Sequence, residues 1–116
     1  MTAITPFDIH DIVHIRGVDH PESIGVGPDG TAYTTGTGCQ VYRLDLETNQ
    51  GHQFSSTEAR CLGTAVDAAG NLYAAHTAGD VLKITPDGEV SVYAAPAGDE
   101  GFLCTNYPAF DRQGRM

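Results

Sequence analysis

The sequence predicts an all-β protein, a partial β-propeller of about two and a half four-stranded antiparallel blades. Asp-bearing turns that end in Gly30, Gly70 and Gly114 recur 40 and 44 residues apart. Periods of roughly 40–45 residues, with four short strands in each unit, are typical of propeller blades. A helical repeat of similar length would need apolar residues at 3.6-residue spacing, and the sequence contains no such stretch.

The strands are expected in four groups along the chain. Residues 9–18, "IHDIVHIRGV", are rich in β-branched residues and predict a leading strand that pairs with a neighbour. Residues 21–56 form blade 1, with strand candidates "SIGVGP", "TAYTTG", "QVYRLDLET" and "HQFSST". Residues 61–96 form blade 2, where "LGTAVDA", "NLYAAHT", "DVLKITP" and "EVSVYAAP" are separated by Ala-Gly and Asp-Gly turn signals. Residues 104–116 contain the same kind of Asp-bearing turn that ends in glycine, and they predict the start of blade 3.

Length limits what these blades can do alone. A closed propeller uses about four to eight blades, so 116 residues make one incomplete domain, 1–116. We expect the chain to be the N-terminal part of a longer protein. Exposed strand edges and blade faces would favour self-association of the chain alone. The alternative is a ring assembled from several copies.

Composition excludes several partners. Asp and Glu number 15 against 6 Lys and Arg, a net charge of −9, so phosphate backbones and anionic membranes are unsuitable partners. The N-terminus lacks the basic start and apolar run of a signal peptide, and no stretch is long and apolar enough for a membrane span. The sequence therefore predicts a cytoplasmic protein. The cysteines, an odd number without C-x-x-C spacing, are expected to be reduced thiols: Cys39, Cys61 and Cys104.

Three motifs are better explained structurally than functionally. The G-x-G-x-x-G match that begins at Gly25 leads into a strand, whereas a dinucleotide fingerprint opens a helix. His10 and His14 stand four apart, but in a strand that spacing does not give the geometry of zinc ligands on a helix. Ser23 lacks the first glycine of a nucleophile elbow and a helix after it.

One register of the repeat carries candidate site residues. Glu22, Leu62 and Asn106 each stand eight residues before a turn glycine. The innermost strand of each blade begins near the central channel, so equivalent positions are expected to converge there. Carboxylate and amide oxygens are ligands that calcium and magnesium prefer, and Glu22 and Asn106 supply them.

The motifs around these positions resemble the senescence marker protein-30/gluconolactonase family of six-bladed propellers. The likeness runs from about residue 10 to the end and is carried by Pro21-Glu22-Ser23, "VDAAGNLYAA" at 66–75 and Asn106-Tyr107-Pro108-Ala109-Phe110-Asp111-Arg112-Gln113-Gly114-Arg115. The turn pattern is shared with strictosidine-synthase-like and NHL-repeat propellers.

The resemblance implies a divalent metal in the channel, with calcium expected and manganese, magnesium and zinc as alternatives. Glu22 matches a metal-binding glutamate, and Asn106 matches a position that contacts substrate or helps to hold the metal. The implied reaction is hydrolysis of a lactone or related cyclic ester, in which the metal polarises the carbonyl and an acidic ligand from a later blade activates water. That general base is expected beyond Met116. The chain alone is therefore expected to bind metal poorly and to have little activity.

The sequence also departs from the family pattern. Some sugar-lactone members carry an arginine two residues before the third-blade asparagine, where this chain has Cys104. This departure puts a sugar-acid substrate in doubt. Two alternatives stay open: a non-catalytic binding or interaction propeller, and a strictosidine-synthase-like enzyme, which would not need the metal glutamate.

Overall fold

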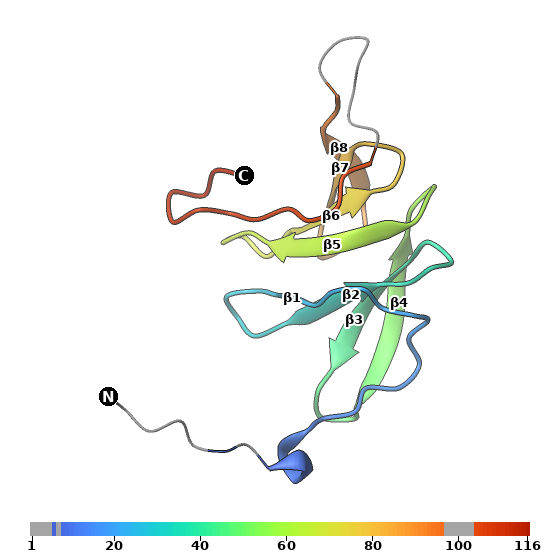
Figure 1. Cartoon of the computed structure of the whole chain (residues 1–116), viewed down its shortest axis with the longest axis vertical. Coiled ribbons are helices and arrows are strands. Elements are labelled where there is room, and N and C mark those ends of the chain that lie inside the picture. Colours follow the sequence, from blue (N-terminus) through green and yellow to red (C-terminus); the bar gives the residue numbers. More distant parts are fainter. Residues whose placement is uncertain (1–5, 7, 97–103) are drawn as a thin grey trace.

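Two four-stranded antiparallel sheets make up the core of the chain (Figure 1). The computed structural model describes residues 6, 8–96 and 104–116. The strand orders are β1-β2-β3-β4 and β5-β6-β7-β8, in which each strand pairs with the next one in sequence. This arrangement confirms the predicted all-β, partial-propeller fold class. The strands are β1 (Gly25–Val26), β2 (Ala32–Thr35), β3 (Gln40–Asp45), β4 (Gln50–Ser56), β5 (Cys61–Val66), β6 (Leu72–His76), β7 (Val81–Ile84) and β8 (Val90–Ala94).

The second strand of each sheet is buried along its whole length. Every residue of β2 and of β6 is buried, whereas most residues of β4 and β8 are partly or fully exposed. A strand covered on both faces has no need for polar and apolar residues to alternate. This explains the sequences "AYTT" and "LYAAH", which are short runs of small and aromatic residues.

The main core lies where one sheet packs on the other. Strand β5 contacts both β1 and β2, and Figure 1 shows it lying across them. Leu72 and Ile84 are fully buried in this core, as is Val41 from the first sheet. Phe54 and Val66 cover its edge. The complete buried cluster is Tyr33, Val41, Cys61, Leu72, Ala74, Leu82 and Ile84.

The same kind of turn, ending in glycine, recurs at three places in the chain. The carboxylate of Asp67 accepts hydrogen bonds from the backbone N–H groups of Ala69 and Asn71, both at 2.9 Å. Gly70 adopts φ +86°, a left-handed conformation that favours glycine. Asp111 binds the backbone N–H groups of Gln113 and Arg115 in the same manner, before Gly114 (φ +77°). In the first copy Gly27 takes the place of this Asp, and Asp29, just before Gly30 (φ +84°), accepts the Thr31 N–H instead. The turn that revealed the repeat is thus a hydrogen-bonded unit.

The prediction of a leading strand at 9–18 is wrong, because no strand is assigned there. Ile9–Asp11 form a short 3-10 helix, η1, because the Asp8 side chain accepts the His10 N–H and Asp11 returns a bond to the Asp8 N–H. Arg16 makes one isolated parallel bridge to Gln50. Gly17 follows with φ +76°, which ends any extended run. The segment instead covers the outer face of the first sheet, where Ile15 and Val18 pack on Ala32, Tyr42 and Leu44.

Residues 104–116 lie beside the second sheet without forming a named strand. A hydrogen bond of 2.7 Å joins the Gly63 N–H to the Asn106 carbonyl oxygen. Phe110 packs edge-on against Tyr73, with ring centroids 5.0 Å apart. The Thr105 hydroxyl also lies within hydrogen-bond distance of the His76 and Asp80 carbonyl oxygens, at 2.9 and 2.6 Å. One backbone bond, these hydroxyl contacts and an aromatic contact therefore hold this segment against the second sheet.

Apolar side chains are exposed on β1 and β8. Val26 is 60% exposed and Val92 56% exposed. Within the described ranges, no helix has the length and apolar character needed to cross a membrane.

We expect Leu72→Ala to destabilise the chain strongly, because Leu72 is fully buried between the sheets. Removing a buried leucine side chain costs about 2–5 kcal/mol of unfolding free energy. Leu46→Ala is the matched control, since Leu46 is 56% exposed and its truncation should cost about 0.5 kcal/mol or less. Urea denaturation followed by circular dichroism measures both values, and equal losses would contradict the assigned core.

Candidate functional site

The structure brings the three register positions onto adjacent segments. Ser23, which follows Glu22, donates its Oγ–H to the Leu62 carbonyl oxygen at 3.0 Å. On the other side of Leu62, the Gly63 N–H binds the Asn106 carbonyl oxygen. The segments that carry Glu22, Leu62 and Asn106 therefore lie in a row. The functional roles of Glu22 and Asn106 stay predictions.

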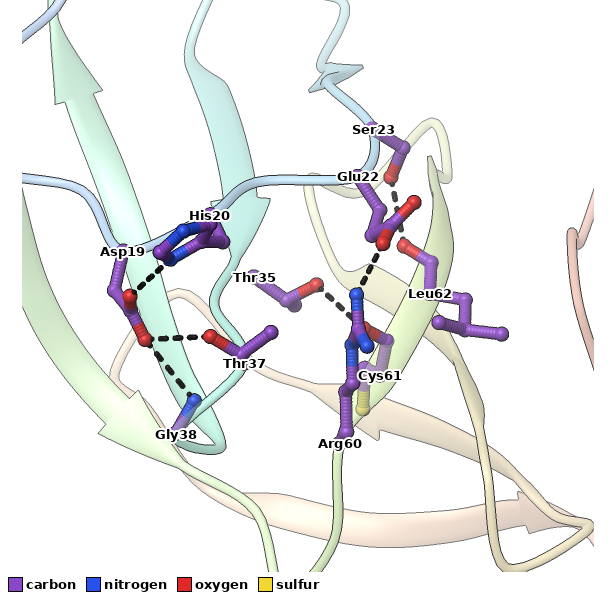
Figure 2. A network of polar contacts seen from close by, with 10 residues as sticks. All are labelled: Asp19, His20, Glu22, Ser23, Thr35, Thr37, Gly38, Arg60, Cys61 and Leu62. Atoms are coloured by element: carbon purple, nitrogen blue, oxygen red, sulfur yellow. Dashed lines mark hydrogen bonds and ion pairs between the residues drawn. The ribbon is translucent and has the colours of Figure 1, made fainter.

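Glu22 forms an ion pair that the sequence analysis missed. Its Oε1 contacts Nη2 of Arg60, the residue just before β5 (Figure 2). The side chain of Glu22 is 48% exposed and that of Arg60 is 37% exposed. Arg60 stands two positions before Leu62. The sequence comparison used only the residue eight positions before each turn glycine, so it did not include Arg60. A search for a cation within two residues of that register would have found it.

Backbone contacts hold Arg60 in place. Its carbonyl oxygen accepts the Thr77 N–H at 2.9 Å, and the preceding Ala59 N–H binds Nε2 of the buried His76 at 3.1 Å. Thr57, at the start of the same linker, donates its N–H to the Cys39 carbonyl oxygen at 2.9 Å. The linker 57–60 is thus fixed to both sheets.

Hydroxyl groups connect the Glu22 segment to the sheets. Ser23 Oγ lies 2.9 Å from Thr64 Oγ1, and the Thr34 hydroxyl donates to the Ser23 carbonyl oxygen. Thr35 reaches across to the Cys61 carbonyl oxygen at 3.2 Å (Figure 2). These bonds link β2 and β5 and hold the backbone beside Glu22. Ser23 therefore has a structural role as a linking residue.

Asp19 anchors the segment that leads into Glu22. Its Oδ2 accepts hydrogen bonds from the Thr37 hydroxyl at 2.8 Å and the Gly38 N–H at 3.2 Å, and its Oδ1 lies 2.7 Å from His20 Nδ1 (Figure 2). The bond from His20, followed by that from Thr37, lowers the pKa of Asp19 to about 2. The carboxylate form is therefore the one that ties residues 19–22 to the β2–β3 turn.

Gly63 permits the close approach of the Asn106 segment. A Cβ atom at this position would lie 2.6 Å from the Asn106 carbonyl oxygen and would collide with the Tyr107 ring. The missing side chain is therefore required for the Gly63–Asn106 hydrogen bond. Asn106 itself is exposed, so its side-chain amide is accessible to a ligand.

Glu22 and Asn106 carry the type of oxygen donor that a hard cation such as calcium prefers. Glu22 offers carboxylate oxygens and Asn106 an amide oxygen, and both residues are exposed. No group of three or more His, Cys, Asp and Glu side chains in residues 6, 8–96 and 104–116 could hold a metal ion. The acidic donor present is the one that Arg60 contacts. The role of Glu22 as a metal ligand therefore stays a prediction.

The remaining candidate residues take structural positions. His10 and His14 are both exposed. The cysteines at positions 39, 61 and 104 are free thiols, as expected. Burial raises the pKa of the Cys61 thiol, which disfavours the reactive thiolate.

Comparisons with solved structures find proteins of related shape. A gluconolactonase from Xanthomonas campestris matches with a TM-score of 0.67 at 21% identity, covering 86% of this chain and 34% of that one. Regucalcin from Agrobacterium tumefaciens, described as a calcium-binding protein, matches with a TM-score of 0.60 at 28% identity, covering 78% and 33%. A PQQ-bound aldose sugar dehydrogenase from Streptomyces coelicolor has a TM-score of 0.53 at 13% identity, covering 85% and 31%.

These matches support the fold more directly than the chemistry. The chain spans about a third of the length of each solved structure. No family model and no curated protein matches the sequence. At 21% identity the gluconolactonase likeness supports the fold alone, and the regucalcin likeness at 28% is in line with the family that the motifs suggested.

We expect Gly63→Ala to release residues 104–116 from the second sheet, because the added Cβ meets backbone and ring atoms. Hydrogen exchange measures this release as lost protection of the residue-63 amide. Gly25→Ala is the matched control, since its Cβ would meet only side-chain atoms, at 3.2–3.4 Å. Retained protection in Gly63→Ala would show that the close approach is not required.

The low pKa of Asp19 predicts a pH-dependent contribution to stability. The folded-state pKa lies below the ordinary value of 3.8, so this contribution is complete above about pH 4 and is lost as the pH falls through about 2. Asp19→Asn should therefore destabilise the chain at neutral pH and flatten its stability profile between those values. Denaturation midpoints, with the exposed Asp87→Asn variant as control, measure the difference. Parallel profiles for Asp19→Asn and the unmodified chain would contradict the assignment.

Proposed function

We propose that this chain provides the first part of a metal-dependent hydrolase that opens a lactone or related cyclic ester. The observation that carries the proposal is the row of inner segments, which places Glu22 and Asn106 on either side of Leu62. The likeness to a gluconolactonase and to a calcium-binding regucalcin supplies the substrate and cation classes.

Each site residue has a distinct part in this proposal. Glu22 binds the divalent cation through its carboxylate, and Asn106 contacts the substrate through its amide. Calcium is the proposed cation, with manganese, magnesium and zinc as alternatives. When bound, such a cation supplies Lewis-acid polarisation of the ester carbonyl. The general base that activates water is assigned to a residue outside this sequence.

Contacts in the rest of the chain fix the backbone at Glu22 and Asn106. The hydroxyl network from Ser23, Thr64 and Thr34 fixes the backbone beside Glu22. Gly63 and its hydrogen bond fix the backbone of Asn106. The net charge of −9 raises the local concentration of divalent cations around the site. The chain thus positions ligands before any cation arrives.

Ring closure completes the proposed site. The exposed apolar side chains of β1 and β8 require a cover, as blade faces do. Further blades of a longer polypeptide, or other copies of this chain, would provide it.

A non-catalytic binding propeller is the second candidate. The observation that favours it is the Arg60 contact, because a carboxylate already paired with a guanidinium has less need of a metal. Lactone turnover that requires added calcium or manganese would exclude this candidate.

We expect Glu22→Gln to lower metal-dependent lactone opening by about 100-fold or more, because the amide loses the charge that attracts the cation. The assay follows hydrolysis of sugar and non-sugar lactones in a pH-stat, with the sequence closed into a ring by a longer polypeptide or by assembled copies. Glu47→Gln, in the exposed turn between β3 and β4, is the control for charge. Unchanged turnover in Glu22→Gln would remove Glu22 from the mechanism.

A further inference from the structure

One nitrogen of the Arg60 guanidinium is paired and another is buried without a partner. Its Nη2 contacts Glu22, while its Nε is buried and has no hydrogen-bond partner among the described residues. A buried N–H without a partner is costly. The ion pair with Glu22 is the interaction that offsets this cost.

Two other acidic residues stand close to the pair in sequence, and neither joins it. Asp19, three residues before Glu22, is engaged by His20, Thr37 and Gly38. Glu58, two residues before Arg60, is exposed and is not in ion-pair contact with it. Within the described part of the chain, Arg60 forms its ion pair with Glu22 alone, and Glu22 forms its pair with Arg60 alone. The carboxylate assigned to the cation therefore already has a cationic partner.

The arrangement allows the guanidinium to leave. The Arg60 backbone is fixed through Thr77 and the neighbouring Ala59, so separation needs only rotation of the side chain. That side chain is 37% exposed, and its outer atoms can be solvated once they leave Glu22. The pair can thus open without unfolding either sheet.

We propose that Arg60 is an intramolecular competitor of the divalent cation at Glu22. The inference rests on the assignment of Glu22 as a metal ligand in the proposed function. A carboxylate has about four lone-pair sites, so it has room to bind a cation and a guanidinium at the same time. They repel each other across it, however, because both carry positive charge at short distance. Cation binding is therefore weakened by Arg60, and a bound cation turns the guanidinium away from Glu22.

The first test compares Mn²⁺ affinity in the 116-residue chain and in Arg60→Gln, from the broadening of amide NMR signals near Glu22. An exposed ion pair contributes up to about 1 kcal/mol, which corresponds to about fivefold, so Arg60→Gln should bind Mn²⁺ about fivefold more tightly. Arg112→Gln is the charge-matched control, because Arg112 lies in the exposed turn before Gly114. Equal or weaker binding by Arg60→Gln would overturn the proposal.

A double variant separates this proposal from the proposed function. In Glu22→Gln, Mn²⁺ binding should weaken, and adding Arg60→Gln should then restore nothing. If Glu22→Gln leaves the affinity unchanged, the metal assignment itself is wrong. If Glu22→Gln weakens binding and Arg60→Gln does not strengthen it, Glu22 remains a ligand and the competition is refuted.

A second readout uses the unmodified chain and does not depend on the folding of a variant. The Nε–H signal of Arg60 is followed by NMR as Ca²⁺ is added. Competition predicts that this signal shifts in step with the signals of Glu22, at the same midpoint concentration. A shift of Glu22 with no change at Arg60 would overturn the proposal.

Discussion

The packing of β5 against β1 and β2 is the contact on which the rest of the structure depends. Strands β2 and β6 are buried along their whole length, and Leu72, Ile84 and Val41 are removed from water. Since burial of apolar surface is the main favourable term in folding, this interface holds together two sheets that, among the described residues, share no ladder hydrogen bonds. The same contact brings Ser23 to Leu62 and so places the Glu22 segment beside the second sheet (Figure 1).

Around that interface, polar contacts give each site residue its position. Asp19 ties the incoming chain to the β2–β3 turn, and the linker 57–60 delivers Arg60 from a backbone bound to both sheets. Glu22 lies between these two anchors and keeps about half of its side chain exposed. Rigid backbones with one exposed carboxylate suit a site that exchanges one cationic partner for another. This is the physical basis of the account of Arg60 and the proposed metal.

The sequence predicted correctly the elements whose hydrogen bonds join residues close together in the chain. The Asp67 turn and its equivalents bind their own backbone within four residues, so their spacing revealed the repeat directly. The segment 9–18 differs from its prediction because Asp8 and Asp11 cap a short 3-10 helix, and because Ile15 and Val18 pack on a sheet face, a long-range contact that composition does not encode. Glu22 and Asn106 were found by register, whereas Arg60 was missed because a side chain that reaches across 38 positions leaves no periodic signal.

The most direct measurement of the central claim is anomalous diffraction from crystals grown with manganese, with the sequence closed into a ring by a longer polypeptide or by assembled copies. The account predicts a manganese peak within about 2.6 Å of a Glu22 carboxylate oxygen, with the Arg60 guanidinium turned away from that carboxylate. Manganese bound elsewhere, with Glu22 and Arg60 still in contact, would contradict it.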